Sequence, residues 1–354
     1  MVSVSGHPVI PGSPPASPAA AARQARWARW QRACADALLA PSPAALRRWA
    51  LAGVATSVLI ILTGAAVRLS QSGLGCPDWP ACTARSLAAS GTTGDPLIHR
   101  WVEFGNRLVT VAIFIVAVGV FIAAWQFRQA DGRPRRDLRW LAAAQPAAIA
   151  LQAVLGGLVV LTRLNPALVS VHFLASVALI AATVALYMRC TEGTGRATAL
   201  VPRLLRHCAA GVVGCVALMM AAGTVVTGTG PLAGAANVAR YHLPLEGVTQ
   251  LHADIGWLLG GLEIALLLGL RLTAAPRTAM RLGWLLLALT ALQGAIGYGQ
   301  YFSGLPAGLV WVHVAGSVAI WVTALLLPYS LRDRGTITGA VRASASATPE
   351  PTAA

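Results

Sequence analysis

The sequence predicts an all-α, polytopic membrane protein whose eight transmembrane helices form two repeated four-helix bundles. Of its 354 residues, 56% are hydrophobic and only 11% are charged. Eight segments reach the length of about 20 mostly apolar residues that a helix needs to cross a bilayer. A stretch of 21 residues, from Gln152 to His172, also recurs later in the chain from Gln293 to His313. The apolar segments cover roughly 49–71, 98–124, 138–162, 168–188, 205–227, 248–270, 280–298 and 308–330.

The recurring stretch relates the two predicted bundles. Each copy begins with Gln, carries Gly four residues later, breaks at Pro and ends at His. The repeat extends beyond this stretch, since AGTVVTGTG at 222–230 resembles TGAAVRLSQSG at 63–73. VTQLHADIG at 248–256 aligns with VEFGNRLVT at 102–110, which puts His252 opposite Asn106. A repeat that keeps His in apolar surroundings predicts a duplicated bundle built to hold a ligand.

The distribution of Arg predicts the orientation in the membrane. All 27 basic residues are Arg, and 21 of them lie in the two tails or in alternate loops on one side of an eight-span topology. Basic loops stay in the cytoplasm, so we expect both termini to be cytoplasmic. The net charge of +15 therefore indicates a surface that faces membrane lipid, and we expect no nucleic-acid partner.

Two bundles and two tails make up the predicted domains. The N-terminal bundle covers 49–190 and the C-terminal bundle covers 205–330. The N-terminal tail, 1–48, starts with a run rich in Pro, Ala, Ser and Gly and is basic further on. We expect this tail and the C-terminal tail, 331–354, to be disordered and cytoplasmic.

Two cysteines lie in the long outer loop at 72–97. Cys76 and Cys82 are separated by six positions, with Pro77 and Pro80 between them. In an oxidising exterior two such thiols can close a disulfide. The pair is then either a staple of the loop or a redox-active pair that passes electrons inward.

The second apolar segment opens with a polar stripe. His99, Glu103, Asn106 and Arg107 are spaced so that they share one face of a helix. Glu103 lies about one turn inside the membrane boundary, where an unpaired carboxylate is costly and a functional role is the default expectation. The stripe is therefore a candidate site near the outer boundary.

Four histidines lie near the outer ends of their helices, two in each half. They are His99, His172, His252 and His313. Bare metal ions usually need three or four clustered ligands, whereas two facing imidazoles in an apolar bundle suit a haem held from both faces. Arg68, Arg100 and Arg107 lie close enough to the boundary to pair with haem propionates.

These motifs together resemble the haem A synthase family. They are SGLGCPDWPAC, EFGNR, LGGLVVLTRLNPALVSVHF, QLHADIG and VWVHVAGS, spread over roughly 50–330. The resemblance implies an eight-helix enzyme of two similar halves that oxidises a methyl group of haem O to a formyl group. The product, haem A, serves the assembly of terminal oxidases.

The resemblance also implies roles for individual residues. His252 and His313 would ligate a resident haem b in the C-terminal half, while the N-terminal half would take the substrate haem O. There His172 would be a ligand of the substrate iron and Glu103 the catalytic carboxylate, while Arg107, which can pair with a propionate, is a predicted contact of the substrate haem. Cys76 and Cys82 would be the outer-loop pair.

One residue departs from the family pattern. The family usually has His where this chain has Asn106. His99 lies seven residues earlier, two turns along the same face and about 10 Å along the helix axis. Either His99 replaces the missing imidazole, or the substrate iron has a single protein ligand.

We expect the protein in the bacterial plasma membrane, with an electron donor that the sequence does not identify. Haem O synthase and terminal oxidase assembly factors are the expected protein partners. One alternative is a non-enzymatic two-haem cytochrome that relays electrons. Another is a transporter with parallel repeats, which would need helices broken near the midplane, whereas Pro166 and Pro306 lie at helix ends.

Overall fold

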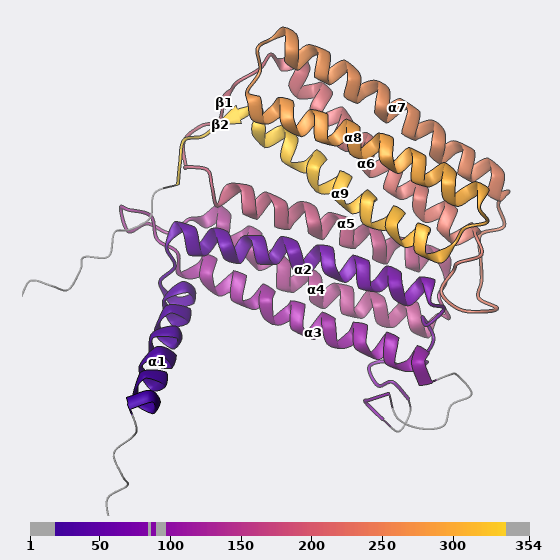
Figure 1. Ribbon diagram of the computed structural model, residues 1–354, viewed down its shortest axis with the longest axis horizontal. Helices are drawn as coiled ribbons and strands as arrows, with labels where there is room; N and C mark the ends of the chain where they lie inside the picture. The colour runs from indigo at the N-terminus through magenta and orange to yellow at the C-terminus, as the bar shows by residue number, and fades with distance from the viewer. Residues whose placement is uncertain (1–17, 84–85, 90–96, 338–354) are drawn as a thin grey trace, which may run out of the picture.

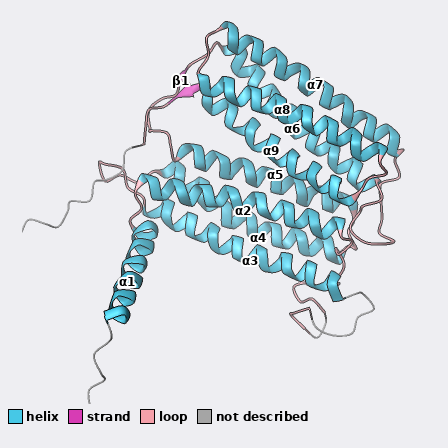
Figure 2. Cartoon of the chain, viewed as in Figure 1, coloured by secondary structure: helices cyan, strands magenta, loops and turns pink. Residues whose placement is uncertain are grey.

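The computed structural model describes residues 18–83, 86–89 and 97–337 (Figure 1). Helices make up most of this part of the chain (Figure 2). The helices are α1 Pro18–Leu39, α2 Pro43–Leu69, α3 Leu97–Gln126, α4 Arg136–Leu161, α5 Pro166–Arg189, α6 Arg203–Thr229, α7 Leu245–Leu272, α8 Arg277–Phe302 and α9 Ala307–Ser330. Two short strands, β1 Thr198–Ala199 and β2 Arg332–Asp333, pair antiparallel.

Helices α2 to α9 are each long and apolar enough to cross a membrane. They coincide with the eight predicted segments, so the predicted fold class is confirmed. The Pro of the recurring stretch marks a helix start in the first copy, because Pro166 is the first residue of α5 and Asn165 caps that helix by accepting the N–H of Ala167 at 3.0 Å. None of the eight described spans is split into two helices, and the broken helices of a transporter are therefore not seen in this part of the chain.

The eight spans fall into two groups of four (Figure 1). In the first group α2 contacts α3, α3 contacts α4, α4 contacts α5, and α5 closes the ring on α2. Helices α6 to α9 repeat this closed pattern in the same order. This arrangement is compatible with two repeated four-helix bundles.

Helix α9 joins the second group to the first. It contacts both α2 and α5, and two indoles tie it to them. The N–H of Trp311 donates to the carbonyl of Leu62 at 3.0 Å, and the N–H of Trp321 donates to the carbonyl of Val177 at 2.9 Å. One apolar core runs across this boundary, so the two groups pack as one unit.

The N-terminal tail differs in part from the expected disorder, because α1 is helical. Its run AAAARQARWARW holds neither Gly nor Pro and is rich in Ala and Arg, which favour helix. Helix α1 contacts α2 and α3, and the carbonyl of Ala37 accepts the indole N–H of Trp49 at 3.0 Å. The remaining parts of the two predicted tails, 1–17 and 338–354, lie outside the described residues.

A charged cluster fastens the C-terminal strand to the first group at the end of the molecule that carries β1 and β2. Arg135 is 1% exposed and holds Asp137 through two hydrogen bonds of 2.9 and 2.8 Å. Arg189 bridges Asp137 and Glu192, each at 2.6 Å. Glu192 in turn accepts Arg332 of β2 at 3.0 Å. The five charged side chains are thereby paired in one continuous chain.

Replacing Asp137 with Ala is expected to destabilise the protein by about 2 kcal/mol, because Arg135 stays buried after it has lost its carboxylate partner. Thermal unfolding in detergent measures this loss. Asp131→Ala is the matched control, since the Arg133–Asp131 pair has side chains that are 82% and 54% exposed and exposed pairs contribute little. Equal unfolding midpoints for the two variants would show that the cluster does not stabilise the fold.

Candidate functional site

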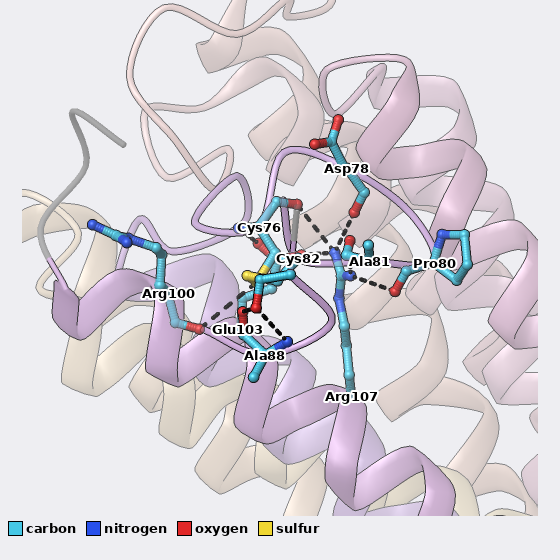
Figure 3. Close-up of a disulfide and its surroundings, with 10 residues drawn as sticks. Cys76, Asp78, Pro80, Ala81, Cys82, Ala88, Arg100, Glu103 and Arg107 are labelled. Atoms are coloured by element: carbon cyan, nitrogen blue, oxygen red, sulfur yellow. Dashed lines mark hydrogen bonds and ion pairs between the residues drawn. A yellow bond between two sulfur atoms is a disulfide. The ribbon is translucent and has the colours of Figure 1, made fainter. Parts of the chain in front are cut away.

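The loop after α2 is fastened to the start of α3 by one carboxylate and one guanidinium (Figure 3). Glu103 accepts the N–H of Cys76 at 2.7 Å through Oε2 and Arg107 Nη2 at 2.6 Å through Oε1. Arg107 also donates to four loop carbonyls, at 3.0 to 3.3 Å, those of Cys76, Asp78, Pro80 and Ala81. The two side chains share a helix face, as predicted. Arg107 is directed at this loop, and its contact with substrate remains a prediction.

The cysteines of the loop form a disulfide. Cys76 and Cys82 are bonded, with Cα atoms 4.3 Å apart, and both are fully buried. The predicted staple is therefore present in the structure, while a redox role for the pair remains a prediction. The disulfide closes the segment that carries Pro77 to Ala81, which keeps Trp79 over the first bundle.

His99 is tied to the same loop. Its Nδ1 lies 2.8 Å from the hydroxyl of Ser72. Gly75 packs so closely there that an added Cβ would lie 2.4 Å from the carbonyl oxygen of His99. Only Gly permits this approach of the loop to the first turn of α3. The structure thus places His99 at the outer rim, in contact with the loop.

Trp79 covers α4 beside the recurring Gly. An added Cβ at Gly157 would lie 2.5 Å from the indole ring of Trp79. The second copy of the stretch has Tyr298 at the aligned position, and the hydroxyl of Tyr298 accepts the indole N–H of Trp257 at 3.3 Å. Both halves therefore have an aromatic ring at this position. In the first half it is Trp79 of the loop, and in the second half it is Tyr298 of α8 itself.

Gly157→Leu is expected to displace Trp79 and loosen the loop. Reduction of the Cys76–Cys82 disulfide by dithiothreitol should become at least about tenfold faster, because both sulfurs lose their burial. Maleimide labelling, after the free cysteines have been blocked, follows the reduction. Gly211→Leu in α6 is the control, since its Cβ would meet no atom within 4 Å among the described residues. Unchanged reduction in Gly157→Leu would mean that Trp79 does not hold the loop.

Three of the predicted histidines lie over a glycine of the neighbouring helix. The distance from an ideal Cβ at the glycine to the Cε1 of the ring measures this approach. It is 3.5 Å for Gly156 and His172, 3.3 Å for Gly223 and His252, and 3.3 Å for Gly297 and His313. In each pair the missing side chain leaves room for an imidazole in the bundle interior.

The glutamines of the recurring stretch hold the histidine helices. Gln152 donates to the carbonyl of His172 at 3.0 Å, and Gln293 donates to the carbonyl of His313 at 2.6 Å. The two halves therefore share a bond between α4 and α5 and between α8 and α9. This explains why the sequence keeps Gln and His twenty residues apart in both copies.

The C-terminal half brings its two imidazoles close together, with their ring planes inclined by 63°. The ring centroids of His252 and His313 are 6.3 Å apart. A metal held between two imidazoles, with bonds of about 2 Å and ring radii of about 1 Å, places the centroids about 6 Å apart. The Nδ1 atoms of both rings are buried and find no hydrogen-bond partner among the described residues. The pair fits the axial ligands of a haem.

A bare metal ion fits these residues less well. No group of three or more His, Cys, Asp or Glu side chains is arranged to hold one within the described part of the chain. The guanidinium of Arg68 donates to the carbonyl of Leu232 at 3.0 Å, and its contact with a propionate remains a prediction.

The N-terminal half brings together only part of the predicted set. Asn106 stands where the second imidazole would be, and its Oδ1 is buried without a partner among the described residues. The Nδ1 of His172 is likewise buried and unpaired there. His99 is tied to the loop by Ser72, whose hydroxyl lies 2.8 Å from its Nδ1. The two halves therefore differ at the position of the second imidazole, where the first half has Asn106.

Two residues of interest were missed by reasoning from the sequence. Trp79 could not be predicted, because it lies in a loop, where hydrophobic periodicity gives no information about packing. Glu263 is 2% exposed inside α7 and accepts the hydroxyl of Thr290 at 2.9 Å. The sequence could have indicated Glu263, because a single carboxylate within the apolar run GWLLGGLEIALLLGL marks a candidate functional group.

Comparison with known proteins agrees with this arrangement. Residues 47–325 match the COX15-CtaA family model, described as cytochrome oxidase assembly protein. The chain is 34% identical over 128 residues to a heme A synthase of Lysinibacillus sphaericus (strain C3-41), covering 36% of this chain and 39% of the relative. It is also 34% identical over 110 residues to a heme A synthase of Geobacillus thermodenitrificans, covering 31% of each.

A third relative, a heme A synthase of Bacillus mycoides (strain KBAB4), is 30% identical over 120 residues, covering 33% of this chain and 35% of the relative. The matched stretches span about two fifths or less of the length of these relatives. The family match extends much further, over both groups of helices that hold the three buried histidines and Glu103. The chain therefore belongs to the COX15-CtaA family of cytochrome oxidase assembly proteins.

Proposed function

We propose that this protein is a haem A synthase, which oxidises one methyl group of haem O to a formyl group. The difference between the two halves carries the proposal. The C-terminal half pairs two imidazoles at 6.3 Å, as a permanent electron carrier requires. The N-terminal half contains one partly buried imidazole, His172, and a buried carboxylate, Glu103, which suits a reaction site. The relatives named heme A synthase support the same activity.

The resident cofactor would be haem b, which His252 and His313 would hold. When bound, it supplies one-electron transfer between an external donor and the other half. The protein positions both ligands through packing, because each ring lies over a glycine, Gly223 or Gly297. Gln293 fixes the backbone at His313 with a hydrogen bond of 2.6 Å.

The substrate is haem O, taken into the N-terminal half with His172 as the ligand of its iron. The loop of the disulfide covers this half from outside, and Trp79 packs on α4 next to the glycine that faces His172. Arg107 positions the loop through its contacts with four backbone carbonyls. The loop thereby excludes water from the methyl group that reacts.

Two successive hydroxylations account for the oxidation. Each inserts one atom of O₂ into a C–H bond of the methyl group, and the other atom leaves as water, with two electrons and two protons supplied from outside the substrate. The resulting gem-diol loses water to give the aldehyde. Glu103 holds a proton at Oε2 or stabilises a developing positive charge at the substrate edge, and it is displaced from the N–H of Cys76 when it does so.

The proposed chemistry takes place on the outer side of the bacterial plasma membrane. Both termini are cytoplasmic, because the Arg-rich tails and loops share one side. The disulfide loop then lies outside, where a disulfide persists. Haem O synthase would supply the substrate, and assembly factors of the terminal oxidase would receive the product.

Expression in cells that make haem O but no haem A tests the proposal. Haems extracted from membranes with and without the chain are separated by chromatography. Haem A is expected only where the chain is present. If haem b and haem O co-purify with the chain and no haem A forms despite a working electron donor, the protein is a two-haem cytochrome.

A further inference from the structure

A carboxyl group lies in the interior of the C-terminal half, apart from every residue of the proposed mechanism. Glu263 of α7 is 2% exposed, and Leu259 and Leu266, one turn away on either side, are each 1% exposed. Its Oε1 accepts the hydroxyl of Thr290 at 2.9 Å, while its Oε2 is buried and has no partner within the described ranges. A buried carboxyl with an unpaired oxygen is costly in apolar surroundings and marks a functional position by default.

The first half of the chain has apolar residues at the equivalent positions. In the alignment of the two halves, Glu263 falls opposite Ala117 and Thr290 falls opposite Ile149. Ala117 and Ile149 are both buried and belong to one apolar cluster. Packing of these two helices therefore needs no carboxyl, and Glu263 is a feature of the half that pairs two imidazoles.

Glu263 shares a face of α7 with His252. Their separation in the sequence amounts to about three full turns of helix, or about 16 Å along the axis. The carboxyl lies on the side of His252 that leads to Arg271, in the last turn of α7. At an effective dielectric constant of about 20, two unit charges at that distance change one another's equilibria about fivefold. A change of charge at the imidazole pair is therefore felt at Glu263.

The other titratable groups around Glu263 do not compete with it for a proton. Helices α6 and α8 pack against α7. The thiols of Cys208 and Cys215 on α6 face α7, with sulfurs 3.9 and 3.8 Å from its carbonyl oxygens, and a thiol already holds its proton at neutral pH. The remaining titratable groups of the second half lie toward the helix ends: Arg203, Arg206, His207, Glu246, His252, Asp254, Arg271, Arg277, Arg281, Tyr298, Tyr301, His313 and Tyr329.

We propose that Glu263 is a proton-binding site coupled to the resident redox centre of the C-terminal half. The inference rests on the proposed function, because it takes a haem held by His252 and His313 as that centre. When an external one-electron donor reduces the ferric iron, the positive charge that stabilises the carboxylate is lost, and Glu263 takes up one proton from water at Oε2. Oxidation reverses both changes, since the electron passes on and the carboxyl releases its proton. The net charge of the bundle interior thereby stays constant during electron transfer.

Redox titrations at a series of pH values test this site. The full chain is purified with its haem b, and the midpoint potential is measured optically between about pH 5 and pH 9, the range in which a buried carboxyl titrates. The potential of the wild type should fall as the pH rises, because reduction binds a proton. Glu263→Gln should remove about a fivefold change in the reduction equilibrium from this dependence, which is about 40 mV at 59 mV per tenfold. Haem propionates titrate in both proteins, so the difference between the two proteins reports Glu263.

Glu246→Gln is the matched control, because Glu246 is an exposed carboxylate in the first turn of the same helix. Its pH dependence should equal that of the wild type. Infrared difference spectroscopy keeps the test decisive if Glu263→Gln does not fold. Reduction of the wild type should add the carbonyl stretch of one protonated carboxyl, and this band should move in heavy water. Thr290→Val should shift the band, because the hydroxyl that donates to Glu263 is then gone.

Two results would overturn the inference. One is an equal pH dependence of the midpoint potential in the wild type and in Glu263→Gln, and the other is a carboxyl band that is missing or that Thr290→Val does not move. Glu263 would then serve only to bond α7 to α8. Failure of the proposed function looks different, since a chain without haem b would overturn both proposals. A proton-coupled haem b in a chain that never forms haem A would uphold the proton site while contradicting the synthase.

Discussion

Replacing His313 with Ala is expected to remove the resident haem from the C-terminal half. Haem b content should fall at least about tenfold. The site holds the haem through two imidazoles whose ring centroids lie 6.3 Å apart, and a single imidazole cannot hold it. His252→Ala should have the same effect. Haem extraction per purified chain measures the loss, and conversion of haem O should stop with it, since no electrons reach the other half.

His207→Ala is the control for these two variants. His207 is an exposed His of α6, far along the helix from Gly223, which lies under His252. The haem b content of His207→Ala should equal that of the wild type. Full haem b content in both His252→Ala and His313→Ala would refute the assignment of the resident site.

Replacing Glu103 with Gln is expected to slow the conversion of haem O about 100-fold or more, a typical loss for a group that handles protons in catalysis. Gln keeps the shape of the side chain, and its single carbonyl oxygen still accepts the N–H of Cys76. The bond from Arg107 is lost, but Arg107 keeps its four contacts with the loop carbonyls, so the loop should stay in place. Haem b content and the rate of disulfide reduction should therefore remain at wild-type values. The ratio of haem A to haem O in extracts measures the effect.

Asp78→Asn provides the matched control, because Asp78 belongs to the same loop and its carboxylate points away from Glu103 and Arg107 (Figure 3). Its conversion of haem O should be close to that of the wild type. If Glu103→Gln also converts haem O at the wild-type rate, Glu103 serves only to hold the loop.

Much of the fold could be predicted because hydropathy and Arg placement are strong signals in a membrane chain. The eight spans follow from length and apolar composition, and the recurring Gln and His reflect a shared hydrogen bond, that of Gln152 to His172 and of Gln293 to His313. Helix α1 was not predicted, because the Pro- and Ser-rich start of the chain outweighed the helix-favouring run of Ala and Arg that follows it.

The candidate site was harder to predict where it depends on loops. Spacing indicated that Glu103 and Arg107 share a helix face, but it could not show that both bind the backbone of the disulfide loop. The position of Trp79 over Gly157 depends on how that loop folds back on α4.

Conversion of haem O by the purified chain tests the proposed function most directly. The chain in detergent is given haem O, a chemical reductant and air, and its haems are extracted and separated over time. Haem A is expected to appear as haem O disappears, with uptake of O₂, while haem b stays constant. Haem O recovered unchanged, while haem b in the same sample is still reduced, would contradict the proposal and leave an electron-relaying cytochrome.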